Sequence, residues 1–154
     1  MQKKYFYLFL FCLVFTFSTA IPVKAQEDEE VFPPQAILIA SYLGDEELVR
    51  EILLCKIDKN VRDNFGDTAL HVAVFQNNIV VVKLLLDYGF DPNAIASRNG
   101  NTPLHNAVAA NNIAAARLLI QYGANKNIKA NNGQTPIDKA RREEKRELVL
   151  LLYR

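Results

Sequence analysis

The feature that most constrains this 154-residue chain is a segment that occurs twice. Residues 67–93 read DTALHVAVFQNNIVVVKLLLDYGFDPN, and residues 101–127 read NTPLHNAVAANNIAAARLLIQYGANKN. His71 and His105 are 34 residues apart, and a third opening, QTPID, follows at residues 134–138. Residues 36–60 fit the same frame without its opening. Repetition at this period predicts supersecondary units that stack and bury a continuous core between neighbours.

Each opening carries the signals of a helix N-terminus. Thr68, Thr102 and Thr135 are N-cap residues whose hydroxyls can pair with free helix N–H groups. Pro103 and Pro136 stand at the first helical position, where a missing N–H costs nothing. With the apolar spacing between these signals, the sequence predicts helices at residues 35–41, 45–54, 68–75, 78–88, 102–109, 113–122, 136–142 and 145–153.

The helix at 78–88 shows which of its sides should be buried. Ile79, Val82 and Leu85 recur at every third position and form one apolar stripe. Val80 and Val81 fall outside this stripe. We therefore expect those two valines to be partly exposed on the convex side.

The second copy resembles the ankyrin repeat, whose unit is a β-turn and two antiparallel helices. The resemblance is carried by Thr102-Pro103-Leu104-His105, Ala107, Leu118-Leu119, Gly123-Ala124 and Asn127. It implies an all-α solenoid of helix–turn–helix units joined by β-turn or hairpin loops. The units are an N-terminal cap at 36–62, repeats at 63–96 and 97–129, and a C-terminal cap at 130–154. Ankyrin arrays bind many unrelated partners, so this fold names none of them.

Residues 1–25 are predicted to be a signal peptide outside the fold. Lys3 and Lys4 precede an apolar run at 5–17, and small or modest residues at 23–25 offer a cleavage site. The run is shorter than the ~20 residues that span a bilayer, so we expect cleavage after Ala25 or Ala20 and no membrane anchor. Export in this form predicts a bacterial periplasm, with secretion as the alternative. Residues 26–35 follow as an acidic, proline-containing lead-in.

Composition narrows the range of partners. Cleavage would remove three lysines and leave 129 residues with 15 basic and 17 acidic side chains. A near-neutral chain gives no electrostatic reason to expect nucleic acid. One domain of this size can bury an adequate core, and we expect it to be monomeric alone.

Cys55 would be the only cysteine left after cleavage, so the chain cannot form an internal disulfide. A disulfide between Cys55 and a partner protein stays an open alternative.

His71 and His105 are the strongest candidates for chemistry. Both stand three residues after a capping threonine, where a side chain can reach back to the cap, and Asp138 takes this place in the last unit. We favour this structural role over the alternative, a metal-dependent enzyme that uses both imidazoles. The chain contains no HExxH, CxxC, GxGxxG or GxxxxGKS motif, and no serine sits in a nucleophile elbow. We therefore predict no enzyme, no metal and no cofactor.

The remaining candidate function is binding of another protein at the surface. By the resemblance, the loop tips and inner helices face one concave side and make the contacts. The predicted protein-binding residues are Tyr42, Leu43, Asn64, Phe65, Asp67, Phe75, Gln76, Arg98, Asn99, Asn101, Ala109, Ala110, Asn131, Asn132, Gln134 and Arg142. Aromatic residues are frequent interface anchors, which singles out Tyr42, Phe65 and Phe75. Their alternative role is to cover the helices beneath them.

The biological role that we expect is a periplasmic adaptor or accessory protein that holds another exported protein. An immunity-type inhibitor of a secreted toxic enzyme and a secreted effector that binds a host protein are the alternatives. Asparagine-rich loops and near-neutral charge favour hydrogen bonds and aromatic contacts over charge steering.

Overall fold

The computed structural model describes residues 32–153, and the predicted signal peptide lies outside them. The described helices are α2 (Ala36–Leu43), α3 (Glu46–Leu54), α4 (Ala69–Phe75), α5 (Ile79–Asp87), α6 (Pro103–Ala109), α7 (Ile113–Gln121), α8 (Pro136–Arg142) and α9 (Arg146–Tyr153). Each predicted helix is present, with its ends within two residues of the prediction. None of the described helices has the length and apolarity that crossing a membrane requires.

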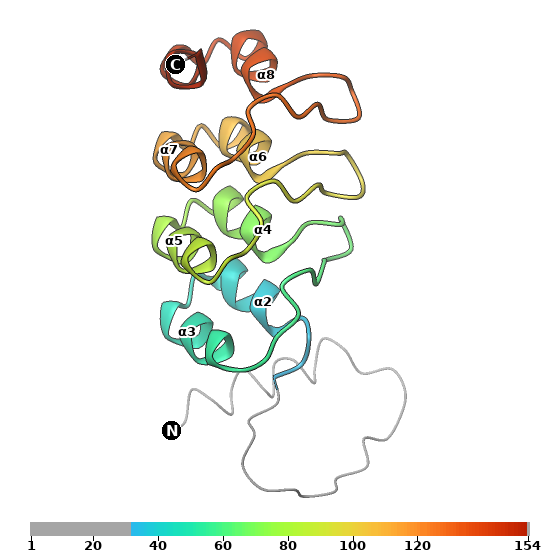
Figure 1. The fold of residues 1–154 in the computed structure, drawn as a ribbon, viewed down its shortest axis with the longest axis vertical. Helices are drawn as coiled ribbons and strands as arrows, with labels where there is room; N and C mark the ends of the chain where they lie inside the picture. Colours follow the sequence, from blue (N-terminus) through green and yellow to red (C-terminus); the bar gives the residue numbers. More distant parts are fainter. Residues whose placement is uncertain (1–31, 154) are drawn as a thin grey trace, which may run out of the picture.

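The helices form two layers (Figure 1). The inner helices α2, α4, α6 and α8 stack in order along the long axis, and each packs against the next. The outer helices α3, α5, α7 and α9 form the second layer, and the long loops between units project from the side of the inner helices. The first unit lies at one end of the stack and α8 and α9 at the other. The predicted all-α solenoid is therefore confirmed.

One hydrophobic core runs through the whole stack. Leu70 and Leu104 of the inner layer and Leu85, Leu119 and Leu148 of the outer layer have no exposed side-chain surface. These residues belong to a single cluster that begins in α2 and ends in α9. Burial of each such leucine contributes about 2 kcal/mol, so every unit depends on its neighbours for stability.

The outer helices begin with side chains that link two units. Asn78 Oδ1 accepts a hydrogen bond from Val81 N, and Asn112 Oδ1 accepts one from Ala115 N. The amide nitrogens reach back to the preceding unit, from Asn78 to Gly44 O at 3.2 Å and from Asn112 to a carbonyl of α4 at 3.4 Å. An aspartate could cap the helix but could not donate this second bond.

The expectation for Val81 was wrong. Val81 is fully buried, whereas Val80 is 39% exposed as expected, and Ile79 of the predicted stripe is 38% exposed. The reason is that α5 packs against α3, α4 and α7 at once. Its buried surface is therefore wider than a single stripe and is turned toward the flanks.

Candidate functional site

The two histidines join successive units. The Thr68 hydroxyl donates to His71 Nδ1 at 2.9 Å, and the backbone N–H of Thr68 lies 3.3 Å from the same nitrogen. The other ring nitrogen, Nε2, lies 3.1 Å from the carbonyl oxygen of Asn101, so Nε2 must carry the proton. His105 repeats this arrangement, with Thr102 at Nδ1 and the carbonyl of Gln134 at Nε2 (3.0 Å). The predicted capping boxes are present.

Burial is the main reason that both imidazoles are neutral. Burial lowers the pKa of His71 from 6.5 to about 4, although the bond to the Asn101 carbonyl opposes the shift. Burial also lowers the pKa of His105. A metal could bind either ring only by breaking a bond at a cap or between units. Within residues 32–153, no three histidine, cysteine or acidic side chains gather into a possible metal site.

All predicted protein-binding residues lie at least partly at the surface. Asp67, Asn101, Ala110 and Gln134 are half-buried, and the other members of the predicted set are exposed. They come from the inner helices and from the loops that project beside them, which share one side of the molecule (Figure 1). We call this side the inner face.

Large apolar side chains gather in the first half of the inner face. Tyr42 and Leu43 at the end of α2 are 62% and 46% exposed. Phe75 takes the place of Tyr42 in α4 and is 60% exposed, and Phe65 at the tip of the loop that precedes α4 is 57% exposed. These four residues are called the apolar patch below. Single exposed apolar residues are ordinary, but several on one face of a small domain mark a contact surface.

Two neighbours of the apolar patch were absent from the predicted set. Ile39 and Val72 are half-buried and precede Tyr42 and Phe75 by three residues on the same helices. Side chains three apart share a helix face, so both extend the patch toward the loops. That spacing was visible in the sequence and could have identified them.

Phe65 owes its exposed place to an aspartate. Asp63 Oδ1 accepts hydrogen bonds from the backbone of Phe65 (2.8 Å) and Asp67 (2.9 Å), which closes the loop tip. Because Asp63 holds the loop, the Phe65 ring is free to project, and the Arg98 guanidinium of the next loop lies 5.3 Å from its centroid. This cation–π contact joins two successive tips.

The later loop tips are held by their own asparagines. Asn99 Oδ1 accepts from the backbone of Asn101 at 2.9 Å, and Asn132 Oδ1 accepts from that of Gln134 at 3.0 Å. The Asn131 side chain reaches the carbonyl of Arg98 at 3.5 Å. Much of the neutral hydrogen-bonding capacity expected for a partner is therefore used to shape the loops.

Asp67 is the electrostatically unusual member of the set. Its Oδ1 is buried and has no hydrogen-bond partner among the described residues. Burial, and then the neighbouring Asp63 carboxylate, raise the pKa of Asp67 to about 6, while Arg62 opposes this shift. The Arg62 guanidinium is engaged with the carbonyls of Gly66 and Ile95 at 2.8 and 2.7 Å.

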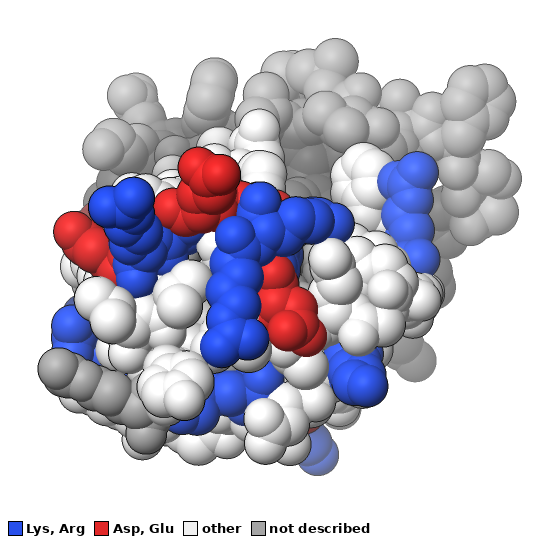
Figure 2. All heavy atoms as spheres, turned by 90° about the horizontal axis from the view of Figure 1, so that it is seen from above, with Lys and Arg blue, Asp and Glu red and all other residues white. Residues whose placement is uncertain are grey.

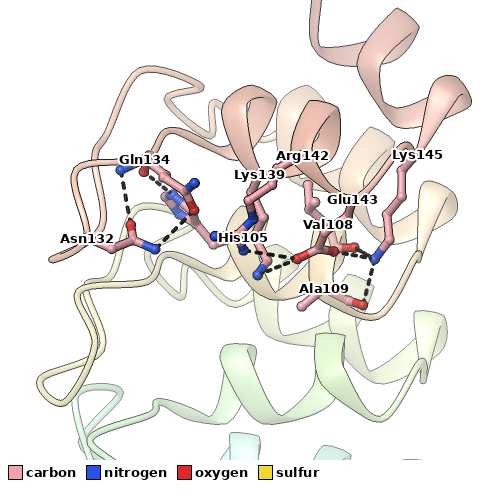
Figure 3. A network of polar contacts seen from close by, with 9 residues as sticks. All are labelled: His105, Val108, Ala109, Asn132, Gln134, Lys139, Arg142, Glu143 and Lys145. Carbon is pink, nitrogen blue, oxygen red and sulfur yellow. Dashed lines mark hydrogen bonds and ion pairs between the residues drawn. The ribbon is translucent and has the colours of Figure 1, made fainter.

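The last unit ends the inner face with charge (Figure 3). Glu143 lies 2.8 Å from Lys145 Nζ, 2.9 Å from Lys139 Nζ and 3.5 Å from the Arg142 guanidinium. Partial burial opposes ionisation, but hydrogen bonds from Lys145 and Lys139 outweigh it and lower the pKa of Glu143 to about 2. Lys145 also donates to the carbonyl of Ala109, 2.9 Å away, which ties the last unit to α6.

Comparisons with known proteins agree with this architecture. A family model of ankyrin repeats (3 copies) matches residues 36–130 and 99–154. A putative ankyrin repeat-containing protein of Treponema pallidum (strain Nichols) is 34% identical over 71 residues, which are 46% of this chain and 23% of that protein. The ANK repeat-containing protein nipk-1 of Caenorhabditis elegans is 54% identical over 39 residues, 25% of this chain and 6% of that protein.

Palmitoyltransferase akr1 of Schizosaccharomyces pombe is 38% identical over 61 residues, 39% of this chain and 10% of that protein. The chain thus spans less than a quarter of the length of each of these relatives, so the likeness covers the repeats alone. Ankyrin repeats generally serve as scaffolds for contacts between proteins, which makes protein the general class of partner. Because the family model covers residues 36–154, this chain belongs to the ankyrin-repeat family.

Proposed function

We propose that this chain is an exported scaffold that holds another protein against its inner face, as an adaptor or accessory protein of the periplasm. The observation that carries the proposal is the apolar patch. Four large side chains, between 46% and 62% exposed, lie on the side of the molecule that also bears the loop tips. Covering them with a partner would remove apolar surface from water at about 25 cal/mol per Å².

The inner face changes in character from one unit to the next. It is apolar at α2 and α4, small and neutral at Ala109 of α6, and charged at Arg142 of α8. A partner with an apolar contact region and polar flanks fits this order. One copy of the domain presents the whole face, so we propose that a single copy suffices for binding and that no catalysis accompanies it.

The proposal of export rests on the sequence of residues 1–25, with its paired lysines, its apolar run and the small or modest residues at 23–25. Cleavage after Ala25 would free the acidic lead-in, and cleavage after Ala20 would leave five more residues on it. The mass of the chain recovered from a periplasmic extract distinguishes these outcomes, and recovery of the uncut chain from cytoplasm would contradict export.

Phe75→Ala tests the proposed surface. Loss of a central aromatic anchor costs about 2 kcal/mol or more, so capture of partners from the extract should fall about thirtyfold. Phe75 is 60% exposed, so the midpoint of thermal unfolding should change little. The measurement is quantitative mass spectrometry of the proteins retained by immobilised wild-type and variant chains.

Tyr88→Ala is the matched control, because Tyr88 is an exposed aromatic (39%) just after outer helix α5. It should leave capture unchanged. Equal losses in both variants, or a large drop in melting temperature with normal capture for Phe75→Ala, would show that the apolar patch is not the binding surface. A toxic secreted enzyme among the specific partners would support an inhibitor, and recovery from the medium with a host protein would support an effector.

A further inference from the structure

The near-neutral total charge hides a strong asymmetry along the chain. Residues 26–54 contain eight acidic residues and one arginine, whereas residues 126–154 contain eight basic and four acidic residues. Residues 36–54 form the unit at one end of the stack, and α8 and α9 lie at the other (Figure 1). Seen end-on from α8 and α9, lysine and arginine side chains cross much of the surface (Figure 2).

The C-terminal end shows which side chains would meet a following unit. Arg141 is exposed at the place where Val74 and Val108 of earlier inner helices are fully buried. Tyr153 is 75% exposed, whereas Leu86, at the same place in α5, is 4% exposed. The next unit covers these places elsewhere in the stack, so Arg141 and Tyr153 mark the uncovered C-terminal flank.

The last unit, residues 130–154, contains six basic and four acidic residues, so this flank has an excess of positive charge. Three of its cations share the single carboxylate of Glu143. Arg141 and Arg146 make no ion pair with another described residue, and they line an open cleft with Glu144, Val149 and Leu150. The flank therefore combines two guanidinium groups outside any ion pair and one carboxylate, Glu144, with exposed apolar surface.

The N-terminal flank has the opposite charge. Glu51 of α3 is exposed at the place where Leu84 of α5 is 7% exposed, because no helix precedes α2 in the described part of the chain. Leu48 is half-buried, although its counterparts Val81 and Ala115 are fully buried. Glu47 is exposed one turn before Glu51. This flank therefore combines carboxylates with a partly uncovered leucine.

We propose that copies of this chain associate head to tail, with the C-terminal flank of one copy on the N-terminal flank of the next. The repeat itself supplies the geometry, since Arg141 and Glu51 occupy places that are buried within one chain. Arg146 and Glu47 lie at the edge of this contact, because their counterparts Ile79 and Val80 are 38% and 39% exposed. Arg141 and Arg146 would then face the carboxylates of α3, and the apolar side chains of α9 would face Leu48. Such a contact is heterologous, so it produces open chains of copies unless a ring closes.

The proposal replaces the expectation of a strict monomer with an association that depends on salt. Charge pairs at the edge of a small interface act over roughly a Debye length, which is about 30 Å at 0.01 M salt and about 3 Å at 1 M. The inner face takes no part in the contact, so binding of another protein and self-association involve separate surfaces. A variant that loses self-association can therefore still be tested for binding of another protein, and the reverse also holds.

The test uses residues 26–154, which include all described helices and their continuous core. Sedimentation velocity should show a mass that rises with concentration at about 0.01 M salt and a monomer at about 1 M. The variants Arg141→Glu/Arg146→Glu and Glu47→Lys/Glu51→Lys should each associate about tenfold more weakly. A mixture of the two should associate again, because the reversed ends complement each other.

Lys83→Glu/Arg117→Glu is the matched control. Both cations are exposed on α5 and α7, the outer helices that have a neighbouring outer helix on each side, and this variant should associate as the wild type does. A wild-type monomer at every concentration in low salt would overturn the proposal. So would association that survives Glu47→Lys/Glu51→Lys, which would indicate a symmetric contact between C-terminal flanks, or a failure of the mixture to associate.

Discussion

One residue in each unit takes a left-handed backbone conformation where the inner helix turns into the outer helix. These residues are Gly44, Asn77, Asn111 and Glu144, with φ between 54° and 68°. Glycine adopts this conformation freely, and asparagine tolerates it better than most residues. Glutamate has neither advantage, so Glu144 stores strain that the other three units avoid.

Glu144→Gly should therefore stabilise the protein. Relief of left-handed strain of about 1–2 kcal/mol exceeds the extra entropy that glycine has in the unfolded chain, about 0.5–1 kcal/mol, so the net gain is about 0.5–1 kcal/mol. Urea denaturation of the variant measures this gain. Glu147→Gly, in the first turn of α9, is the control and should lose about 1 kcal/mol. An unchanged or lower stability of Glu144→Gly would show that Glu144 is not strained.

Between elements, the two histidines form polar bridges from one unit to the next, beside the asparagine links of the outer helices. His71 joins the start of α4 to the backbone just before α6, and His105 joins α6 to the backbone just before α8. The ring must stay neutral, because Nδ1 accepts from a threonine while Nε2 donates to a carbonyl. Protonation of either ring in acid would therefore break a hydrogen bond of the bridge between two units.

Stability should fall as pH decreases from about 6.5 to about 4. In this range the unfolded chain binds a proton at His71, whose ordinary pKa is 6.5, while the folded chain with its pKa of about 4 does not. This difference in proton binding alone lowers the free energy of unfolding by about 3 kcal/mol across the window. Urea titrations at several pH values measure the change.

Asp67 acts in the opposite direction and supplies a comparison. Its pKa of about 6 in the folded protein lies above the ordinary 3.8, so its protonation stabilises the fold as pH falls from 6 to 3.8. Asp67→Asn removes both the stabilisation that protonation of Asp67 provides in acid and the cost of a buried charge at neutral pH. The variant should be more stable than the wild type at pH 7 and lose stability more steeply in acid. Parallel pH profiles of the two proteins would refute this account of Asp67.

For the whole molecule, the stack has covered units in the middle and half-covered units at its ends. α4 and α6 pack against inner helices on both sides, whereas α2 and α8 each have a single inner neighbour among the described helices. In repeat proteins stability is roughly a sum of unit and interface contributions, so the ends should open first.

Hydrogen exchange should follow this order. Backbone amides of α4 and α6 should exchange most slowly, and those of α2 and α9 should exchange fastest among the helices, as measured by mass spectrometry of peptic fragments. At about 0.01 M salt, head-to-tail association would slow exchange at α9 and α3 in particular. Uniform protection of all helices at high salt would show instead that the stack opens as one cooperative unit.

The sequence by itself determined the helices, their ends and their stacking order. Capping threonines, the prolines after them and the 34-residue period act through local geometry, which a short stretch of chain contains. It also placed the predicted protein-binding residues at the surface, because a position repeated in each unit meets a similar environment. Phe75 and Tyr42, for example, occupy one place in two units and are both exposed.

Only the tertiary structure decided how each position is used, because burial and pairing depend on the neighbouring unit. Val81 is buried by helices distant in sequence, and His71 Nε2 finds its acceptor 30 residues away. Equivalent places also diverge at the ends of the stack, where Arg141 and Glu51 replace buried apolar residues and receive opposite charges. A repeat pattern describes an average unit, whereas α2 and α8 each have a single inner neighbour among the described helices.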